Sequence, residues 1–274
     1  MLTDGRMWLA PVAAGLWLLQ AGAPGVEDIR LRYVANAGVL ATVEGRSFLI
    51  DAPIREGIAP YATSPAEERR RLESASAPYD DVAAILITHW HEDHLSAEAV
   101  AAHLASNPHA MLVSSPEVIA RVHAAGPTLP AARLRAVLPQ PGHAETTDVA
   151  GVTVRVLRIR HNPARRVPEQ HVGFLIGADA AVLHVGDADP RPDNFAVLRG
   201  LPKVDLALLP FWYVLDEPGR AFVRDAIGPR RVFAMHVPPA DAAGLAGRLG
   251  AGVATVPPQP GRVVSLPGRA AGDR

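Results

Sequence analysis

The apolar run Val82-Ala83-Ala84-Ile85-Leu86-Ile87 constrains the fold of this chain more than any other segment. Six consecutive apolar residues without alternation predict a strand that is buried on both faces. Helices are predicted on either side of this strand, over residues 64–76 and 96–105, and the second begins at Ser96 as its N-cap. The sequence therefore predicts a sheet that is covered by helices.

Short apolar runs separated by Gly, Pro and Asp predict further strands and helices on both sides of this segment. Strands are expected at residues 29–34, 39–43, 47–50, 110–113, 152–160, 172–176, 181–185, 204–209, 231–235 and 263–266, and helices near 116–124, 218–227 and 239–249. Residues 44–46 predict a tight hairpin turn between the second and third strands. The alternation of strands and helices indicates an α/β or α+β domain, with a frayed tail after residue 266.

The N-terminal segment has a different character. Residues 7–19 are uncharged and apolar, with Arg6 before them and Ala21-Gly22-Ala23 after them, which resembles a secretory signal peptide. An uncleaved membrane anchor and a cytoplasmic helix are the alternatives. We therefore expect a leader or anchor over residues 1–25, a single domain over 26–274, and export to the periplasm or the medium, with a cytoplasmic location as the alternative.

Composition excludes several classes of site. The 274 residues include no cysteine, so disulfides, thiolate nucleophiles, iron–sulfur clusters and cysteine-type zinc sites are all ruled out. Any metal must be held by nitrogen and oxygen. The formal net charge is −1, and this near-neutral balance argues against nucleic acid or an anionic membrane as the main partner.

Metal ligands are concentrated directly after the buried strand, in Thr88-His89-Trp90-His91-Glu92-Asp93-His94. In an extended segment His89 and His91 point to the same side, so both imidazoles can reach one ion. The following turn can present Asp93 and His94 to a neighbouring ion. Four ligands within six residues predict a site for two metals.

Three further ligand candidates each follow an apolar strand: His161, Asp187 and His236. Sheets of this class gather their sites at the carboxyl ends of the strands. The apolar phase of the strand before His161 shifts near residue 157, and this shift places His161 on the buried face. Gly186 allows the backbone to approach closely beside Asp187.

Other histidines are open alternatives for individual roles. His171 and His143 could each supply the third ligand of the first metal in place of His161, and His171 could instead lie at the rim of the site. His184 points away from Asp187 along its strand, so we expect it to pack beside the ligands rather than bind metal.

These residues resemble the metallo-β-lactamase fold hydrolases, whose hallmark is His-x-His-x-Asp-His followed by a later His, an Asp and a last His. All of these elements are present in order, and the likeness extends over about residues 29–266. Residues 48–51, 186–187 and 204–210 also look like that family. The motif set is specific for the fold and the metal site and says little about the substrate.

The resemblance implies a four-layer αβ/βα sandwich of two mixed β-sheets, with helices outside and the site at one sheet edge. It also implies a distribution of the ligands, with His89, His91 and His161 on one metal, Asp93, His94 and His236 on the other, and Asp187 bridging the two.

Such a site predicts a hydrolase. Two divalent ions can share a water molecule, lower its pKa and direct the resulting hydroxide at a carbonyl or phosphoryl centre. Asp93 is expected to orient this nucleophile or accept its proton as well as to bind metal. Zinc is the default ion for this ligand set, and manganese or iron would also fit. Asp51 either fixes a ligand histidine from behind or caps a turn.

Few residues give information about the substrate. Arg165 and Arg166 could bind a phosphate or carboxylate, or they could be solvated loop charges. Trp212 could wall an apolar pocket beside the metals, or it could belong to the core.

The favoured function is cleavage of a small-molecule ester, lactone, amide or phosphodiester. The alternatives are a nuclease or RNA-processing enzyme on the same scaffold and a metal-binding protein without catalysis. The expected partner is a small-molecule substrate, with no nucleic acid and no stable membrane span beyond a possible N-terminal anchor, and the sequence leaves the oligomeric state open.

Overall fold

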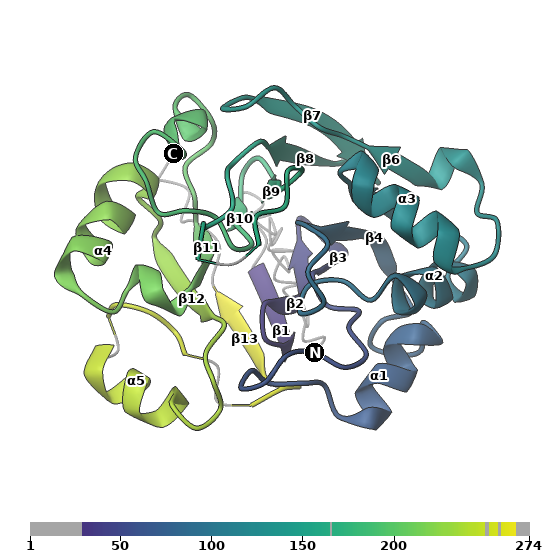
Figure 1. The fold of residues 1–274 in the computed structure, drawn as a ribbon, viewed down its shortest axis with the longest axis horizontal. Helices are drawn as coiled ribbons and strands as arrows, with labels where there is room; N and C mark the ends of the chain where they lie inside the picture. Colours follow the sequence, from purple (N-terminus) through teal and green to yellow (C-terminus); the bar gives the residue numbers. More distant parts are fainter. Residues whose placement is uncertain (1–28, 165, 250–251, 257–258, 267–274) are drawn as a thin grey trace, which may run out of the picture.

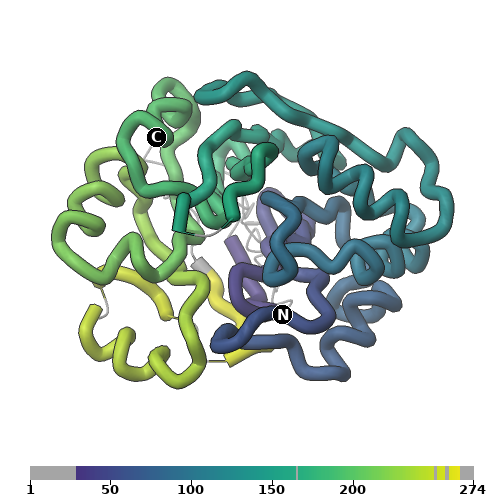
Figure 2. The backbone as a smooth tube through the Cα atoms, in the orientation of Figure 1, coloured from purple at the N-terminus to yellow at the C-terminus, as the bar shows by residue number. Residues whose placement is uncertain are grey.

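The computed structural model describes residues 29–164, 166–249, 252–256 and 259–266. Two β-sheets stack face to face and helices cover their outer sides (Figure 1). The same path can be followed as a tube in Figure 2. The expected leader over residues 1–25 and the tail after residue 266 lie outside the described residues, so the expectations for both stay predictions.

The first sheet has seven strands in the order β13-β1-β2-β3-β4-β5-β6. Its members are β1 (Ile29–Ala35), β2 (Gly38–Val43), β3 (Arg46–Ile50), β4 (Val82–Ile87), β5 (Met111–Ser114), β6 (Leu134–Ala136) and β13 (Val263–Leu266). The first three strands form an antiparallel meander, and β3 to β6 run parallel to one another. Glu44 and Gly45 have φ values of 48° and 72° between β2 and β3, as a tight hairpin turn requires.

The second sheet has six strands in the order β12-β11-β10-β9-β8-β7. Its members are β7 (Ala144–Val149), β8 (Val152–Leu157), β9 (Gly173–Ile176), β10 (Val182–His184), β11 (Leu206–Pro210) and β12 (Arg231–Met235). The strands from β7 to β10 are antiparallel, while β10, β11 and β12 are parallel. Both sheets are mixed, as predicted.

Helices occupy the outer side of each sheet (Figure 1). The first sheet is covered by α1 (Ala66–Glu73), α2 (Ala97–Ser106) and α3 (Pro116–Ala125), and the second by α4 (Glu217–Phe222) and α5 (Ala242–Leu249). A π-helical turn over Val223–Ile227 continues α4. Short 3₁₀ turns lie at Ala131–Arg133, Ala196–Leu198 and Phe211–Tyr213.

Apolar side chains form three buried layers that hold these elements together. Strand β4 contributes to two of them, because Ala84 and Leu86 face the core between the sheets while Ile85 and Ile87 face the helices. All four side chains have no exposed surface. The prediction of a strand buried on both faces is therefore confirmed, and with it the four-layer sandwich.

The structure corrects the predicted elements in two respects. Strands β6 and β7 were not predicted, since β6 has only three residues and β7 is mostly polar and exposed and shows no apolar alternation. Strand β8 ends at Leu157 rather than at residue 160. The predicted shift of phase is present, because Val156 and Leu157 are both buried and Ile159 continues the buried face. Within the described ranges, no helix combines the length and apolar character that crossing a membrane would need.

Candidate metal centre

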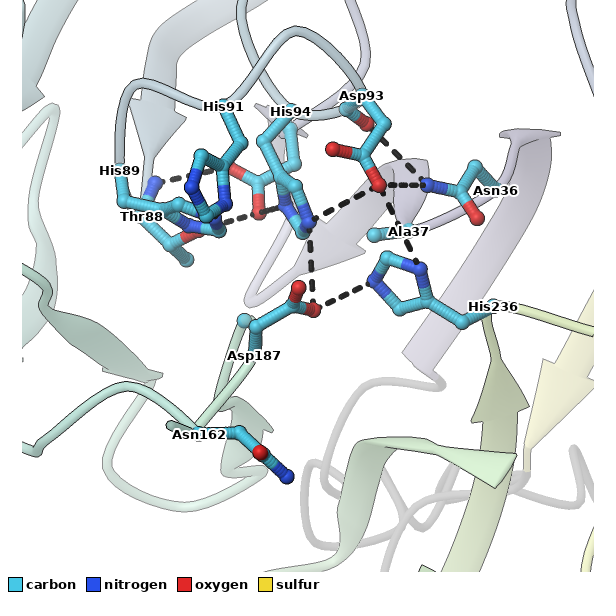
Figure 3. Close-up of polar contacts among 12 residues, drawn as sticks. Asn36, Ala37, Thr88, His89, His91, Asp93, His94, Asn162, Asp187 and His236 are labelled. Carbon is cyan, nitrogen blue, oxygen red and sulfur yellow. Dashed lines mark hydrogen bonds and ion pairs between the residues drawn. The ribbon is translucent and has the colours of Figure 1, made fainter. Parts of the chain in front are cut away.

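The seven predicted metal ligands come from four parts of the chain that the two sheets bring together, and Figure 3 labels all of them except His161. His89, His91, Asp93 and His94 lie in the loop between β4 and α2, His161 follows β8, Asp187 follows β10 and His236 follows β12. Their exposed fractions lie between 0% and 5%. The site thus lies at the edge where strands of both sheets end.

The backbone at the end of β10 fits only glycine. Gly186 has a φ of 55°, and a Cβ at this position would lie 2.7 Å from Thr88 Oγ1 and 2.8 Å from His171 Nε2. The tight turn at Gly186 brings the next residue, Asp187, up to the loop of the other sheet.

The first cluster consists of His89, His91, His161 and Asp187, whose candidate ligand atoms all lie within 4.8 Å of one another. His89 Nε2 and His91 Nδ1 are 2.9 Å apart, and His161 Nε2 is 3.6 Å from Asp187 Oδ2. Three imidazoles and a carboxylate converge on one point.

The second cluster consists of Asp93, His94, Asp187 and His236, again within 4.8 Å. Asp187 Oδ1 lies 2.7 Å from His236 Nε2 and 3.3 Å from His94 Nε2, while Asp93 Oδ2 lies 3.9 Å from His236 Nδ1. The two clusters share Asp187, since its Oδ1 faces the second and its Oδ2 the first.

Hydrogen bonds on the outer side of the first cluster fix its tautomers. His91 donates from Nε2 to the carbonyl oxygen of Arg166 at 2.9 Å, and His161 donates from Nδ1 to that of Asn162 at 2.6 Å. His89 donates from Nδ1 to Thr88 Oγ1 at 2.9 Å, because the Thr88 hydroxyl hydrogen is used on Asp51. Each ring therefore turns an unprotonated nitrogen to the centre.

These orientations fit metal ions. Lone pairs of His89 and His91 face each other at 2.9 Å, an arrangement that calls for a cation between them. His94 Nε2, His161 Nε2, His236 Nε2 and Asp187 Oδ1 are buried and have no partner with hydrogen-bond geometry, although His236 Nε2 and Asp187 Oδ1 lie 2.7 Å apart. Buried polar atoms normally have one, so four such atoms in one place favour a metal centre. The ligand assignment itself stays a prediction.

The charges of two predicted ligands, His89 and Asp187, point the same way. Burial, together with the charge of His94, lowers the pKa of His89 well below its usual range. Burial alone would raise the pKa of Asp187, but the charges of His236 and His94 lower it well below the usual range. For His94 the two effects act the other way round. Burial alone would lower its pKa, but the charges of Asp187 and Asp51 raise it well above its usual value. An ionised Asp187 and a neutral His89 are the forms that bind metal.

Asp51 lies fully buried behind both clusters. Its Oδ2 accepts hydrogen bonds from His94 Nδ1 at 2.7 Å and from the Thr88 hydroxyl at 2.6 Å, and its Oδ1 accepts the Thr88 N–H at 2.8 Å. Through Thr88 it also orients His89. Of the two roles considered for Asp51, the structure places it behind ligand histidines, one in each cluster.

We expect Asp51→Ala to weaken the binding of both metals, because a ligand of each then loses its orienting partner. Loss of such a partner typically lowers metal affinity about 10- to 100-fold. Titration of the metal-free protein with zinc in competition with a chelating dye measures the change. Thr88→Val removes the partner of His89 and one hydrogen bond to Asp51, but it leaves the bond between Asp51 and His94, so the first equivalent should weaken more than the second. Asp81→Ala, at the exposed opposite end of β4, is the matched control, and an Asp51 variant that binds like this control would contradict the assignment.

The other predicted histidines lie outside both clusters. His184 is buried between the sheets, donates from Nε2 to the carbonyl oxygen of Ala37 at 3.0 Å and accepts the N–H of Gly186. His171 is buried with its ring centre 5.0 Å from that of His89, and its Nδ1 donates to the carbonyl oxygen of Ile159. Burial lowers the pKa of His171 to about 3. His143 lies in an exposed turn before β7.

Two of the predicted substrate residues border the clusters. Trp212 lies with its ring centre 5.5 Å from that of His236 and also packs against the core under α4 and α5, so it borders both the second cluster and the core. The guanidinium of Arg166 lies over the ring of Trp90, 5.1 Å from its centre. Arg165 lies outside the described residues. A cavity of about 620 Å³ adjoins His161 and His171, with Arg158, Val167 and Glu169 in its wall.

Sequence reasoning missed two neighbours of the second cluster. Asn36, at the turn between β1 and β2, donates hydrogen bonds to Asp93, and the ring of Tyr61 lies edge-on to His236 with the ring centres 5.1 Å apart. Tyr61 stands in a loop without periodicity, and nothing in the sequence marks it. Asn36 could have been found from its place between two predicted strands, where asparagine tolerates unusual backbone angles.

The family model described as the beta-lactamase superfamily domain matches residues 46–256, which is most of the chain. No curated protein matches the sequence.

Several solved structures have a similar fold. Igni18, a metallo hydrolase of the archaeon Ignicoccus hospitalis, is 19% identical with a TM-score of 0.60, over 89% of this chain and 100% of that one. A possible metal-dependent hydrolase of Veillonella parvula is 19% identical with a TM-score of 0.61, over 88% and 100%. CmlA, a diiron β-hydroxylase of Streptomyces venezuelae, is 16% identical with a TM-score of 0.54, over 89% and 55%. At these identities the likeness concerns the fold alone.

Proposed function

Because the chain belongs to the metallo-β-lactamase superfamily, we propose that it is a hydrolase that works with two divalent metal ions. Its substrate is a small-molecule ester, lactone, amide or phosphodiester. The observation that carries this proposal is the shared carboxylate: Asp187 turns one oxygen to each ligand cluster. A carboxylate between two groups of ligands is what a dinuclear centre needs.

The chemistry divides between the metals and the chain. When bound, the two ions supply an acidified water nucleophile and polarise the bond to be broken. His89, His91 and His161 would hold one ion and Asp93, His94 and His236 the other, with Asp187 available to both. The Asp93 carboxylate, a member of the second cluster that is hydrogen-bonded to Asn36, would accept the proton of the nucleophile. The outer hydrogen bonds to Arg166, Asn162, Thr88 and Asp51 keep the imidazoles in place through the reaction.

Zinc is the proposed ion. Five histidines and two aspartates offer nitrogen and oxygen only, a set that suits zinc and also manganese or iron. The similar fold of CmlA, which is a diiron protein, makes iron the alternative to be measured.

A small substrate is favoured over a nucleic acid. The cavity beside His161 has a volume of about 620 Å³, which is in the range of small-molecule sites. The formal net charge of −1 gives no general attraction for a polyanion. Trp212 and Tyr61, whose ring centres lie 5.5 and 5.1 Å from that of His236, supply apolar surface for the substrate.

Metal content is the first test. Protein purified without added metal or chelator is expected to carry about two equivalents of zinc, manganese or iron per chain, because two separate sets of ligands are present. Elemental analysis by mass spectrometry measures both the amount and the identity. No bound metal, and none taken up at micromolar free zinc, would contradict the proposal and favour a binding protein without catalysis.

A substrate panel follows once the ion is known. Ester, lactone, amide and phosphodiester substrates are compared with the metal-loaded protein and with the same protein after removal of the metal. Hydrolysis is expected only in the loaded form, with recovery on return of the ion. Activity that survives metal removal would belong to another site or a contaminant.

A further inference from the structure

The two-residue turn between β1 and β2 reaches from the first sheet into the metal centre (Figure 3). The carbonyl oxygen of Asn36 accepts the N–H of His236 at 3.4 Å, and that of Ala37 accepts the Nε2–H of His184 at 3.0 Å. Gly38 lies so close to the end of β3 that a Cβ would come within 2.8 Å of the Asp51 carbonyl oxygen. The turn is therefore fixed on several sides.

The Asn36 side chain donates its hydrogen bonds to a single residue, Asp93. Asn36 is 1% exposed and donates from Nδ2 both to Asp93 Oδ2 and to the Asp93 carbonyl oxygen, at 3.3 Å each. The Asn36 Oδ1 atom is buried without a hydrogen-bond partner. The opposite amide orientation would turn this oxygen toward the Asp93 carboxylate, so the two acceptors on Asp93 fix the amide as observed.

The backbone conformation at position 36 restricts which residue types can occupy it. Its φ of 49° lies in the left-handed region, which asparagine enters more readily than other residues with a side chain. Glycine would satisfy the backbone equally well, but it would leave Asp93 without these donors. The backbone conformation of the turn thus favours glycine or asparagine, and of these two only asparagine has an amide that contacts a predicted metal ligand.

We propose that Asn36 is a positioning residue for the second metal ion: its amide holds the Asp93 carboxylate in the ligand orientation before the ion arrives. This inference rests on the proposed two-metal centre and adds to it a residue outside the ligand set. A side chain that is already held in its ligand orientation loses less conformational entropy when the ion binds, so the ion binds more tightly.

The contacts of Asn36 predict an effect on one ion only. Asp93 belongs to the second cluster and not to the first, and the side chain of Asn36 has no hydrogen bond to a ligand of the first. Removing the amide should therefore weaken the second equivalent of metal and leave the first unchanged. A residue with a merely structural role would affect both equivalents or the folding of the whole chain.

Asn36→Gly makes this test without backbone strain. Metal-free wild type and variant are titrated with zinc by calorimetry, and their melting temperatures are compared without metal. We expect one equivalent to bind as in the wild type and the other to bind about 10- to 100-fold more weakly, in the range for lost orienting partners. Asn36→Ser, whose side chain is too short to reach Asp93, serves if the glycine variant cannot be purified.

Ala37→Gly is the matched control. It loosens the same turn but leaves the Asn36 amide and both backbone carbonyls in place, so both equivalents should bind as in the wild type. Equal weakening of the second equivalent in Ala37→Gly and Asn36→Gly would assign the effect to turn mobility and overturn the proposal. Unchanged binding in Asn36→Gly, or equal weakening of both equivalents, would overturn it as well.

The wild-type titration separates this inference from the proposed function. A wild type that binds two equivalents, with an Asn36→Gly variant that also binds both normally, refutes the role of Asn36 and leaves the dinuclear centre standing. A wild type that binds none refutes the centre itself, and the role of Asn36 with it.

Discussion

Asp93→Ala is expected to lower turnover by at least about 10²- to 10⁴-fold, the range for loss of a proton-transferring group. The loss exceeds this range if the second metal is lost with the carboxylate. Asp93 lies beside His94 and His236 and faces the second cluster, so the variant removes a ligand and a proton acceptor at once. Steady-state rates on the best substrate of the panel, with metal content measured in parallel, test this expectation.

The fold should tolerate this change. Asp93 stands in the loop between β4 and α2 and belongs to none of the three apolar layers, so its loss leaves the packing of both sheets intact. Circular dichroism and the melting temperature of the metal-free protein report on this. Glu92→Ala is the matched control, since this neighbouring carboxylate is exposed and belongs to neither cluster, and it should leave turnover at the wild-type level. Wild-type turnover in Asp93→Ala would remove Asp93 from the mechanism.

Asp187→Ala is expected to be as damaging, for a different reason. Its two oxygens face different clusters, with Oδ1 2.7 Å from His236 Nε2 and Oδ2 3.6 Å from His161 Nε2. One substitution therefore removes a ligand from both ions, and bound metal should fall from about two equivalents to fewer than one under the same purification. Turnover should be abolished with it.

The comparison with Asp93→Ala makes the second experiment specific. Asp93→Ala should retain the first equivalent of metal, while Asp187→Ala should retain neither in full. Asp189→Ala is the control, because this carboxylate lies two residues further on and belongs to neither cluster. Full metal content in Asp187→Ala would show that the carboxylate does not join the two sites.

Much of the framework could be predicted because its signals are local. The β4 run is apolar on both faces, and only a strand between two layers satisfies that pattern. The spacing from His89 to His94 placed four ligands in one loop, and no folding can separate residues that close in sequence. The strand ends at His161, Asp187 and His236 gave the remaining ligands, since strands that run the same way end at one edge of a sheet.

Other features escaped because they depend on residues far apart in sequence. Strand β7 is polar and mostly exposed, and it exists because β8 offers it an edge with which to pair. Tyr61 reaches His236 from a loop with no pattern of its own. The sequence leaves two roles open for Asp51. Only the pairing of β3 with β4 places its side chain against Thr88 and His94.

By itself the sequence determined the class of elements, the type of ligand atom and the ligand-bearing loops, because hydrophobic periodicity and donor chemistry are properties of each segment. The tertiary structure decided which nitrogen of each imidazole faces the centre, how Asp187 is shared, and that Asn36 holds Asp93 from 57 residues away. Those features rest on hydrogen bonds between segments, whose distance and direction are defined only once the two sheets have packed.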